Sequence, residues 1–151
     1  MSERRIDAIK ALGRWRAFQQ ALAERHQWQA ARARAEAQDA LAKTRVVAVA
    51  IARRRQAMLT EARLDPAHLQ FVAGIEQRAW DAVAEHDAYM ADAEIAERVA
   101  REKHRVARIR VRVVDARRDR QVAAEVDRRE KQQFDRIAAL RAATVAGERD
   151  D

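Results

Sequence analysis

The 151-residue sequence contains no cysteine, one proline and three glycines. The absence of cysteine excludes disulfides, thiolate catalysis and thiolate metal sites within these residues, and it fits a reducing compartment. One proline and three glycines supply too few turns for a globular domain built from many short elements. The sequence therefore predicts long, uninterrupted elements.

Aromatic residues and long apolar runs are also scarce. The chain has three Trp, three Phe and one Tyr, and no segment approaches the roughly 20 apolar residues that a membrane-spanning helix needs. The N-terminal segment MSERRIDAIKALGRW lacks the apolar core of a secretory signal. We therefore expect a cytoplasmic protein that does not insert into a membrane.

Charge, by contrast, is abundant. Asp, Glu, Lys and Arg make up 36% of the chain, and the formal net charge is +7. Together with the many alanines and glutamines, this is a composition typical of a coiled coil. The positive net charge favours acidic partners, which include nucleic acid, anionic lipid and acidic protein surfaces.

The only proline marks the one predicted turn. Asp65 can cap a helix and Pro66 suits the first helical position, so a helix should start here and the preceding one should stop by about Leu64. We predict a single all-α domain over residues 1–151, in which two long helices form an antiparallel coiled-coil hairpin. Its helices should cover about residues 2–64 and 66–146, followed by a frayed C-terminal tail.

Apolar spacing supports both helices and predicts which residues face each other along the seam between them. In the first helix the predicted seam positions are Leu12, Trp15, Phe18, Leu22, Ala30, Ala33, Ala37, Leu41, Thr44, Ala48, Ile51 and Met58. In the second helix they are Ala79, Val83, His86, Met90, Ala93, Glu97, Ala100, His104, Ala107, Val111, Val114 and Arg118. The second set has a strict period of 3.5, which implies a left-handed supercoil.

The segment Arg108-Ile-Arg-Val-Arg-Val-Val alternates charged and branched apolar residues, as a half-buried strand does. A strand here would need a partner, and isolated two-stranded ribbons are marginal in water. Val111 and Val114 also fall on the predicted seam, and no glycine or proline lies between Ile75 and Ala146. We therefore predict that residues 108–114 are helical.

The charge pattern tests the hairpin, because residue i should face roughly residue 130 minus i. Residues 76–97 contain seven acids, opposite a basic stretch that includes Lys43, Arg45 and residues 53–55. Farther from the turn, residues 98–120 contain ten basic residues and three acids, and they face further arginines. Such repulsion favours an acidic surrounding for that end of the hairpin, although the same arginines would also serve to solubilise a helix.

Motifs for catalysis and cofactor binding are missing from the sequence. It has no glycine-rich phosphate loop, no HExxH and no compact Ser, His and Asp constellation, so we predict a protein that is not an enzyme and holds no cofactor. The four histidines are too dispersed for a metal site. His26 and His104 should lie near each other in the hairpin, but two ligands make a poor site.

The three tryptophans suggest a different kind of contact. Trp15 falls on the predicted seam and is expected in the core, whereas Trp28 and Trp80 could be exposed anchors for a protein partner. A basic-zipper fold is disfavoured because the basic block lies inside the seam-bearing segment and leucine heptads are absent.

Two further segments carry a family resemblance. One is Gln70-Phe-Val-Ala-Gly-Ile-Glu, just after the turn, and the other is Arg129-Glu-Lys-Gln-Gln-Phe-Asp-Arg-Ile-Ala, near the C-terminus. The first is similar to the Gln-Phe-aliphatic-x-x-aliphatic-acid stretch, and the second to the closing charged segment, of the FliJ/YscO (SctO) family, the ATPase central stalk proteins of flagellar and virulence type III secretion. Length, the single turn and antiparallel arms match as well, so the resemblance spans nearly the whole chain.

The resemblance implies a two-helix stalk, cytoplasmic and peripheral to the inner-membrane export apparatus. Its partners would be the hexameric secretion ATPase, the cytoplasmic domain of the export gate and the export chaperones. Phe71 and Ile75 match the family motif and become candidates for the export-gate contact. The residues Ala50-Ile-Ala-Arg-Arg-Arg depart from the pattern, because some relatives have tyrosines before the turn.

With an acidic ring as partner, the basic segment supplies the candidates for the ATPase contact, which are Arg105, Arg108, Arg110, Arg112 and Arg117. As a helix, the segment is basic around much of its circumference, which suits a stalk inside a ring. Nucleic acid, which needs a single basic face, is the less favoured partner. The alternative function is a free basic coiled-coil adaptor or a nucleic-acid-associated protein, for which a steep salt dependence of DNA binding would be expected.

Overall fold

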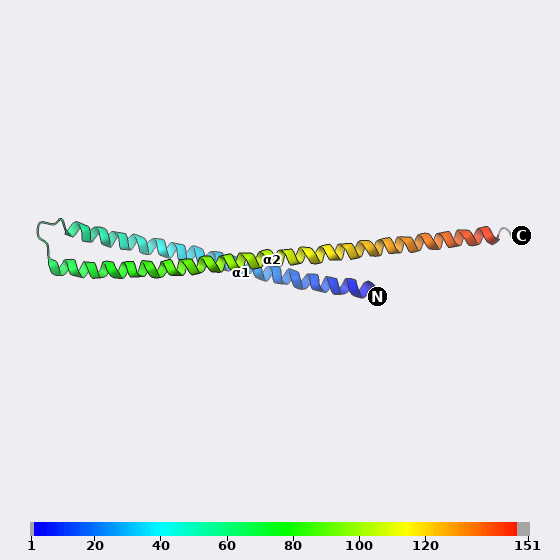
Figure 1. Ribbon diagram of the computed structural model, residues 1–151, viewed down its shortest axis with the longest axis horizontal. Helices are drawn as coiled ribbons and strands as arrows, with labels where there is room; N and C mark the ends of the chain where they lie inside the picture. The colour runs from blue at the N-terminus through cyan, green and yellow to red at the C-terminus, as the bar shows by residue number, and fades with distance from the viewer. Residues whose placement is uncertain (1, 148–151) are drawn as a thin grey trace. The chain divides into compact units, whose positions relative to one another are not determined.

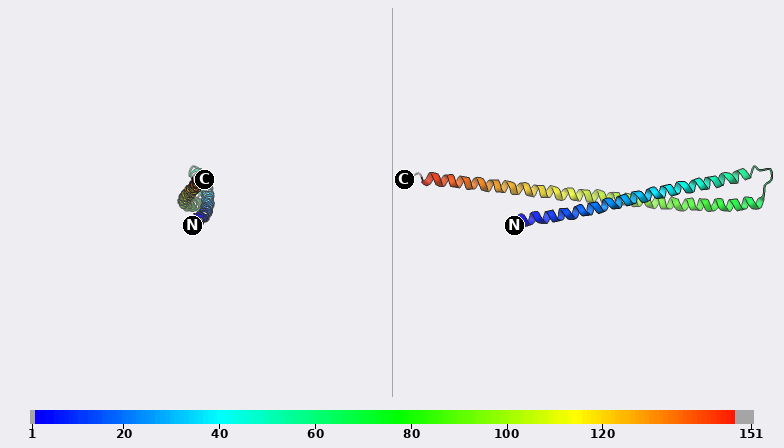
Figure 2. Two further views of the ribbon diagram at one scale, coloured as in Figure 1. Left: turned by 90° about the vertical axis from the view of Figure 1, so that its right-hand side faces the viewer. Right: turned by 180° about the vertical axis from the view of Figure 1, so that it is seen from behind.

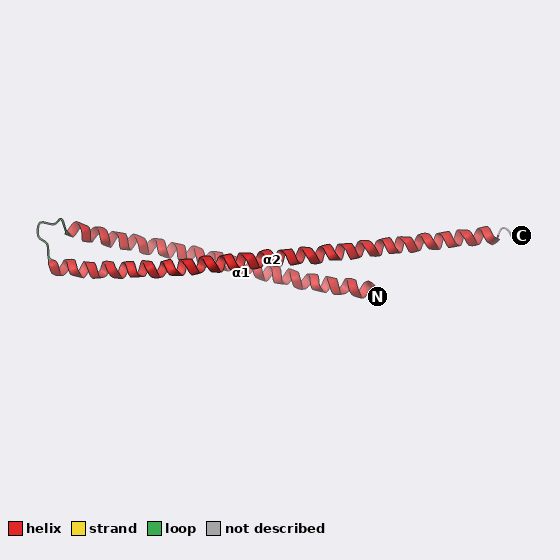
Figure 3. Ribbon diagram, viewed as in Figure 1, coloured by secondary structure: helices red, strands yellow, loops and turns green. Residues whose placement is uncertain are grey.

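The computed structural model describes residues 2–147, and the side chains of residues 4–144. It contains two long helices, α1 (Ser2–Met58) and α2 (Pro66–Gly147), joined by one turn (Figure 1). No strand occurs in the described range (Figure 3). The predicted all-α helical hairpin is therefore confirmed, and residues 108–114 are helical. The predicted frayed tail after residue 147 lies outside the described residues.

The chain divides into two compact units. Leu22–Arg105 forms one, which we call the turn unit, and Met1–Ala21 with Val106–Asp151 forms the other, which we call the terminal unit. Each unit contains part of α1 and part of α2. The turn that links the C-terminal end of α1 to the N-terminal end of α2 belongs to the turn unit (Figure 2).

The start of α2 is fixed by Asp65 and Pro66, as the sequence predicts. Asp65 Oδ1 accepts hydrogen bonds from the backbone N–H groups of Ala67 at 3.0 Å and His68 at 3.4 Å. These are two of the N–H groups that a helix leaves without partners at its N-terminus, and Pro66 has no N–H to satisfy. Asp65 is therefore the N-cap of α2.

Helix α1 ends at Met58, six residues before the predicted end at Leu64. The next three N–H groups donate to the carbonyl three residues back, at 3.1 to 3.2 Å, which tightens the chain into a turn. The sequence 59–64 contains no glycine or proline, so local propensity does not stop the helix. Packed helices lie about 8–10 Å apart, and the chain needs these residues to reach the fixed start of α2.

In the turn unit the two helices pack through a narrow seam. Leu41, Ala48 and Val83 form its buried cluster, against which Ala79 and Met90 pack. Ala48 is fully buried, so the two helix backbones approach closely there. Ion pairs and hydrogen bonds that cross the seam join residues whose numbers add up to between 128 and 132, in agreement with the predicted register of about 130.

The seam of α2 is confirmed from Ala79 to Val114, because each predicted position is buried or half-buried. Of the twelve predicted seam positions in α2, Arg118 alone is exposed. In the terminal unit Val114 is 9% exposed and faces Gly13, where an added Cβ would lie 3.7 Å from Val114 Cγ1. From Ala116 to Thr144 every residue except Glu125 is exposed, because the terminal unit has only 20 residues of α1 to pack against this part of α2.

The predicted seam of α1 is wrong near its start. Leu12, Trp15, Phe18 and Leu22 are 40 to 59% exposed, and so Trp15 is not a core residue. A continuous line of buried or half-buried positions runs along the helix instead, through Ile6, Ile9, Gly13, Arg16, Gln20, Ala23, Gln27, Ala30, Arg34, Ala37, Leu41, Thr44, Ala48, Ile51, Arg55 and Met58. Gln19, Ala31, Ala40 and Ala52 flank this line and are also half-buried. The intervals between positions on this line alternate strictly between three and four residues along α1, as in a coiled coil. The more apolar stripe at the start of α1 does not keep this alternation. Ala33, another predicted position, is exposed.

Candidate interaction surfaces

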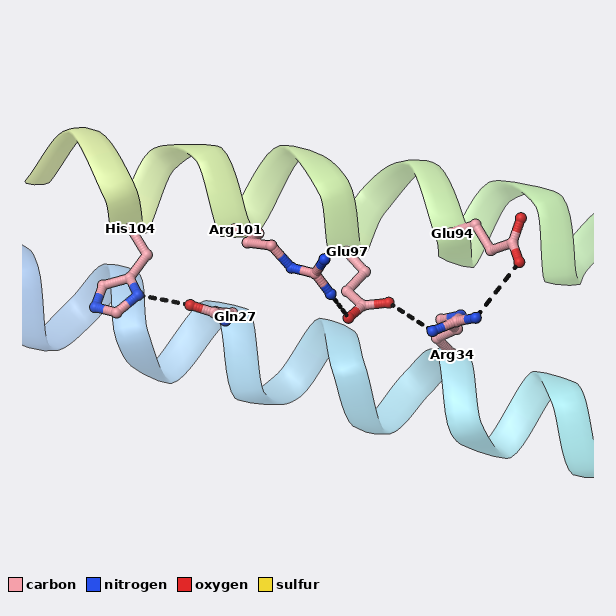
Figure 4. A network of polar contacts seen from close by, with 6 residues as sticks. All are labelled: Gln27, Arg34, Glu94, Glu97, Arg101 and His104. Carbon is pink, nitrogen blue, oxygen red and sulfur yellow. Dashed lines mark hydrogen bonds and ion pairs between the residues drawn. The ribbon is translucent and has the colours of Figure 1, made fainter.

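A network of charged and polar side chains fills part of the seam in the turn unit (Figure 4). Glu97 is only 9% exposed, and it accepts hydrogen bonds from Arg34 at 3.3 Å and from Arg101 on its own helix. Arg34 also lies 3.7 Å from Glu94. A carboxylate at this depth is tolerated because two guanidinium groups compensate its charge. The network therefore specifies the register of α1 against α2 with charge as well as shape.

His104 adds a second polar layer to the same unit. Its Nδ1 lies 2.6 Å from Gln27 Oε1 on α1. An amide oxygen only accepts hydrogen bonds, so Nδ1 carries the proton that is donated. Nε2 is buried without a partner, as is Nε of Arg34. The predicted meeting of His26 and His104 does not occur, because His26 is exposed and Gln27 occupies the seam position.

Near the turn, two of the five basic residues expected to face the acids of α2 form ion pairs with them. Arg45 bonds Asp87 at 3.0 Å, and Arg55 forms an ion pair with Glu76. Lys43 instead bonds Asp39 at 2.7 Å on its own helix. The hydrogen bond that Lys43 donates to Asp39 is the main reason that the pKa of Lys43 is raised.

The five arginines proposed for the ATPase contact are all exposed. Arg105 lies in the turn unit and the other four lie in the terminal unit. Arg105 donates hydrogen bonds to both carboxylate oxygens of Glu102, at 2.7 and 2.8 Å. This contact raises the pKa of Arg105 and lowers the pKa of Glu102, so both groups remain charged at neutral pH.

The four candidate arginines of the terminal unit form no ion pair with any side chain among residues 4–144. On a helix with 100° per residue, Arg108 and Arg112 lie on one flank of the buried Val111–Val114 line, and Arg110 and Arg117 lie on the other. Their positive charge is therefore not neutralised by any side chain among residues 4–144, and it faces two directions.

The candidates beside the turn differ in exposure. Phe71 is 62% exposed, whereas Ile75 is half-buried and its neighbour Val72 is 9% exposed. Leu59 and Leu64 in the turn segment are each 47% exposed. The turn unit therefore presents several large apolar side chains close to the turn in sequence.

Other exposed side chains were missed by reasoning from sequence. Trp15 stacks on Phe18 with ring centroids 5.8 Å apart, and both rings are more than half exposed. Trp28 and Trp80 are exposed, as expected for anchors. On α2, Ile95, Ile109 and Val113 point away from the seam and are 45 to 59% exposed. They are 14 and 4 residues apart, spacings that place side chains on one face of a helix, and this pattern predicts a second apolar stripe.

The described residues contain no group of three or more His, Asp or Glu side chains that could hold a metal ion. A groove of the terminal unit, about 360 Å³ in volume, lies beside Gly13 and Val114 and includes both Arg14 and Asp115 in its lining. Neither helix, over the part that the structure describes, has a stretch long and apolar enough to cross a membrane.

No family model, no curated protein and no solved structure matches this chain. Its function must therefore be argued from the exposed surfaces of the two units.

Proposed function

We propose that this chain is the stalk component of a flagellar or virulence type III secretion apparatus, of the FliJ/YscO type. In this role it binds the hexameric secretion ATPase, links it to the export gate and contacts export chaperones. It contributes binding surfaces and no catalytic residue. The motif after the turn and the closing charged segment, quoted above, connect the chain to this family.

The observation that supports the proposal most is the charge of α2 in the terminal unit. Arg108, Arg110, Arg112 and Arg117 are exposed and lie on both flanks of the seam, and they form no ion pair with the side chains that the structure describes. A ring lined by acidic side chains would meet positive charge on both flanks. Each exposed pair contributes only about 0.2 to 1 kcal/mol, so several such pairs must act together.

Charge reversal tests this proposal. Replacing Arg108, Arg110 and Arg112 by Glu should abolish binding to the secretion ATPase and stimulation of its activity, because attraction to an acidic lining becomes repulsion. ATPase activity and pull-down should be measured at low and at moderate salt, since screening weakens exposed pairs. Unchanged stimulation at low salt would show that these arginines serve solubility alone.

The matched control reverses three exposed arginines of the turn unit, Arg25, Arg53 and Arg63, which changes the net charge by the same amount. We expect this variant to stimulate the ATPase as the unchanged chain does. An equal loss in both variants would mean that net charge, and not the basic segment, determines binding.

Nucleic acid is the competing partner, and the same exposed arginines make it a candidate. Titration of duplex DNA at several salt concentrations separates the two functions. Tight binding with a steep salt slope, lost in the triple variant, would favour a nucleic-acid-associated protein over the stalk.

A further inference from the structure

Helix α2 carries an acidic face in the turn unit that points away from its own seam. Glu85 and Asp92 are exposed and form no ion pair with any described side chain, and Glu85 bonds only Tyr89 on the same helix. The two carboxylates are seven residues apart, two helical turns, so they lie along one flank. Beside them runs an exposed apolar stripe of Trp80, Ala84, Ala88, Ala91 and Ile95.

The same helix carries the opposite face in the terminal unit. Arg110 and Arg117 are exposed and also seven residues apart, and within the described part of the chain they form no ion pair. Beside them lie Ile109 and Val113, which are 45% and 59% exposed. Each segment thus combines an apolar stripe with a charged flank that has no partner of opposite sign, and the two segments carry opposite charge.

From this complementarity we propose that the acidic face of one copy, residues 80–95, docks on the basic face of a second copy, residues 106–117. The chain would then self-associate through α2, independently of any secretion ATPase. Exposed apolar side chains between the charged flanks supply the contact, and the charges select the partner face.

The sense of rotation around the helix fixes the direction of docking. In both segments the charged flank lies about 80° from the apolar stripe in the same rotational sense, as the residue spacing at 100° per residue shows. Two faces of this kind bring their charged flanks together only when the helices run antiparallel. An antiparallel α2–α2 contact is therefore expected.

The register follows from the spacing of the charges. When Glu85 lies opposite Arg117, Asp92 lies opposite Arg110, because both pairs are seven residues apart. In this register Ala88 lies near Val113 of the other copy, and Ala91 lies near Ile109. Small alanines on one face receive the branched side chains of the other, as in a coiled-coil seam.

On the other side of the apolar stripe, the two docking faces also carry charges of opposite sign. Asp87 and Glu94 would meet Arg112 and Arg108 of the second copy, although both carboxylates already contact arginines of α1. Within the two faces, no like charges are brought together in this register. The acidic face extends over about 24 Å of helix and the basic face over about 18 Å, and an interface of this size gives weak association.

The test measures self-association of the purified full chain by sedimentation over a range of concentrations, with no ATPase present. We expect concentration-dependent association that weakens as salt increases. The variants E85R/D92R and R110E/R117E should each raise the dissociation constant about tenfold or more, since each creates like-charge pairs. The four residues are exposed, so circular dichroism should report unchanged helicity.

The decisive variant combines all four reversals, E85R/D92R/R110E/R117E. It exchanges the signs of the two faces, so association should return towards that of the unchanged chain. Reversal of Arg25 and Arg53 to Glu, outside both faces, is the control and should leave association unchanged. The proposal is overturned if the unchanged chain is monomeric at every concentration, or if the fourfold variant stays helical and does not associate. Equal weakening in the control would also overturn it.

Discussion

Small residues determine how closely α1 and α2 approach each other. Ala48 is fully buried in the turn unit, and Gly13 faces the buried Val114 in the terminal unit. None of the described glycines has a positive φ angle, so Gly13 and Gly74 adopt backbone conformations that any residue can adopt. Both lie inside helices, where glycine costs about 0.5 to 1 kcal/mol relative to alanine.

Replacing Gly13 by Ala should therefore stabilise the chain by about 0.5 to 1 kcal/mol. The new Cβ would meet Val114 Cγ1 at 3.7 Å, an ordinary van der Waals distance that adds contact without strain. Gly74→Ala is the matched variant, since nothing lies within 4 Å of its added Cβ. Urea unfolding followed by circular dichroism measures both, and a Gly13→Ala chain that unfolds at lower urea would contradict this packing.

Individual residues show how far the sequence predicts the seam. Glu97 and His104 are polar, yet the period of 3.5 in α2 places them correctly. Trp15 belongs to the apolar stripe that the sequence predicts as the seam of α1, yet it is 54% exposed. Its neighbour Arg16 is half-buried instead, because one continuous heptad face runs along the whole of α1. Periodicity predicted burial better than hydrophobicity did, since so much of this seam is alanine, glutamine and arginine.

At the scale of elements, local signals predict where α2 begins but not where α1 ends. Asp65 caps α2 through side-chain hydrogen bonds that the sequence alone implies. Helix α1 ends at Met58 because of the distance to α2, which is a tertiary constraint. For the same reason the candidate site near the turn was only partly predictable: the motif includes Phe71, but the exposure of Leu59 and Leu64 follows from the early end of α1.

The export-gate contact is predicted to lie on the first turns of α2. Replacing Phe71 and Ile75 by Ala should weaken binding to the cytoplasmic domain of the export gate, while ATPase binding and helicity remain. Phe71 is 62% exposed, so its truncation removes contact area from a partner and little from the fold. Ile75 is half-buried, and its truncation adds a modest loss of stability.

Pull-down with the isolated gate domain measures the effect, and Phe134→Ala is the control. Phe134 is 72% exposed on α2 in the terminal unit, so the control removes a similar exposed ring at a different place. If the Phe71 and Ile75 variant loses its helicity, these residues belong to the core and the gate contact is not located here.

For the whole molecule, the two units differ in how much apolar surface they bury. Among residues 4–144, six apolar residues are buried: Leu41, Ala48, Met58, Val72 and Val83 belong to the turn unit, and Val114 belongs to the terminal unit. The ion pairs that cross the seam, such as Arg45 with Asp87, also lie in the turn unit. The free energy needed to unfold a segment locally rises with the number of buried contacts that must be broken. The turn unit should therefore be the more stable of the two.

Native-state hydrogen exchange on the full chain tests this difference, because it reports the opening free energy of each segment. Backbone amides near Leu41, Ala48 and Val83 should exchange slowest. Amides of residues 121–144 should exchange fastest, since every side chain there except Glu125 is exposed and helical hydrogen bonds alone protect them. Binding of a partner to this part of α2 would slow its exchange and leave the turn unit almost unchanged. Uniform protection along all of α2 in the free chain would show instead that the helix opens as one cooperative element.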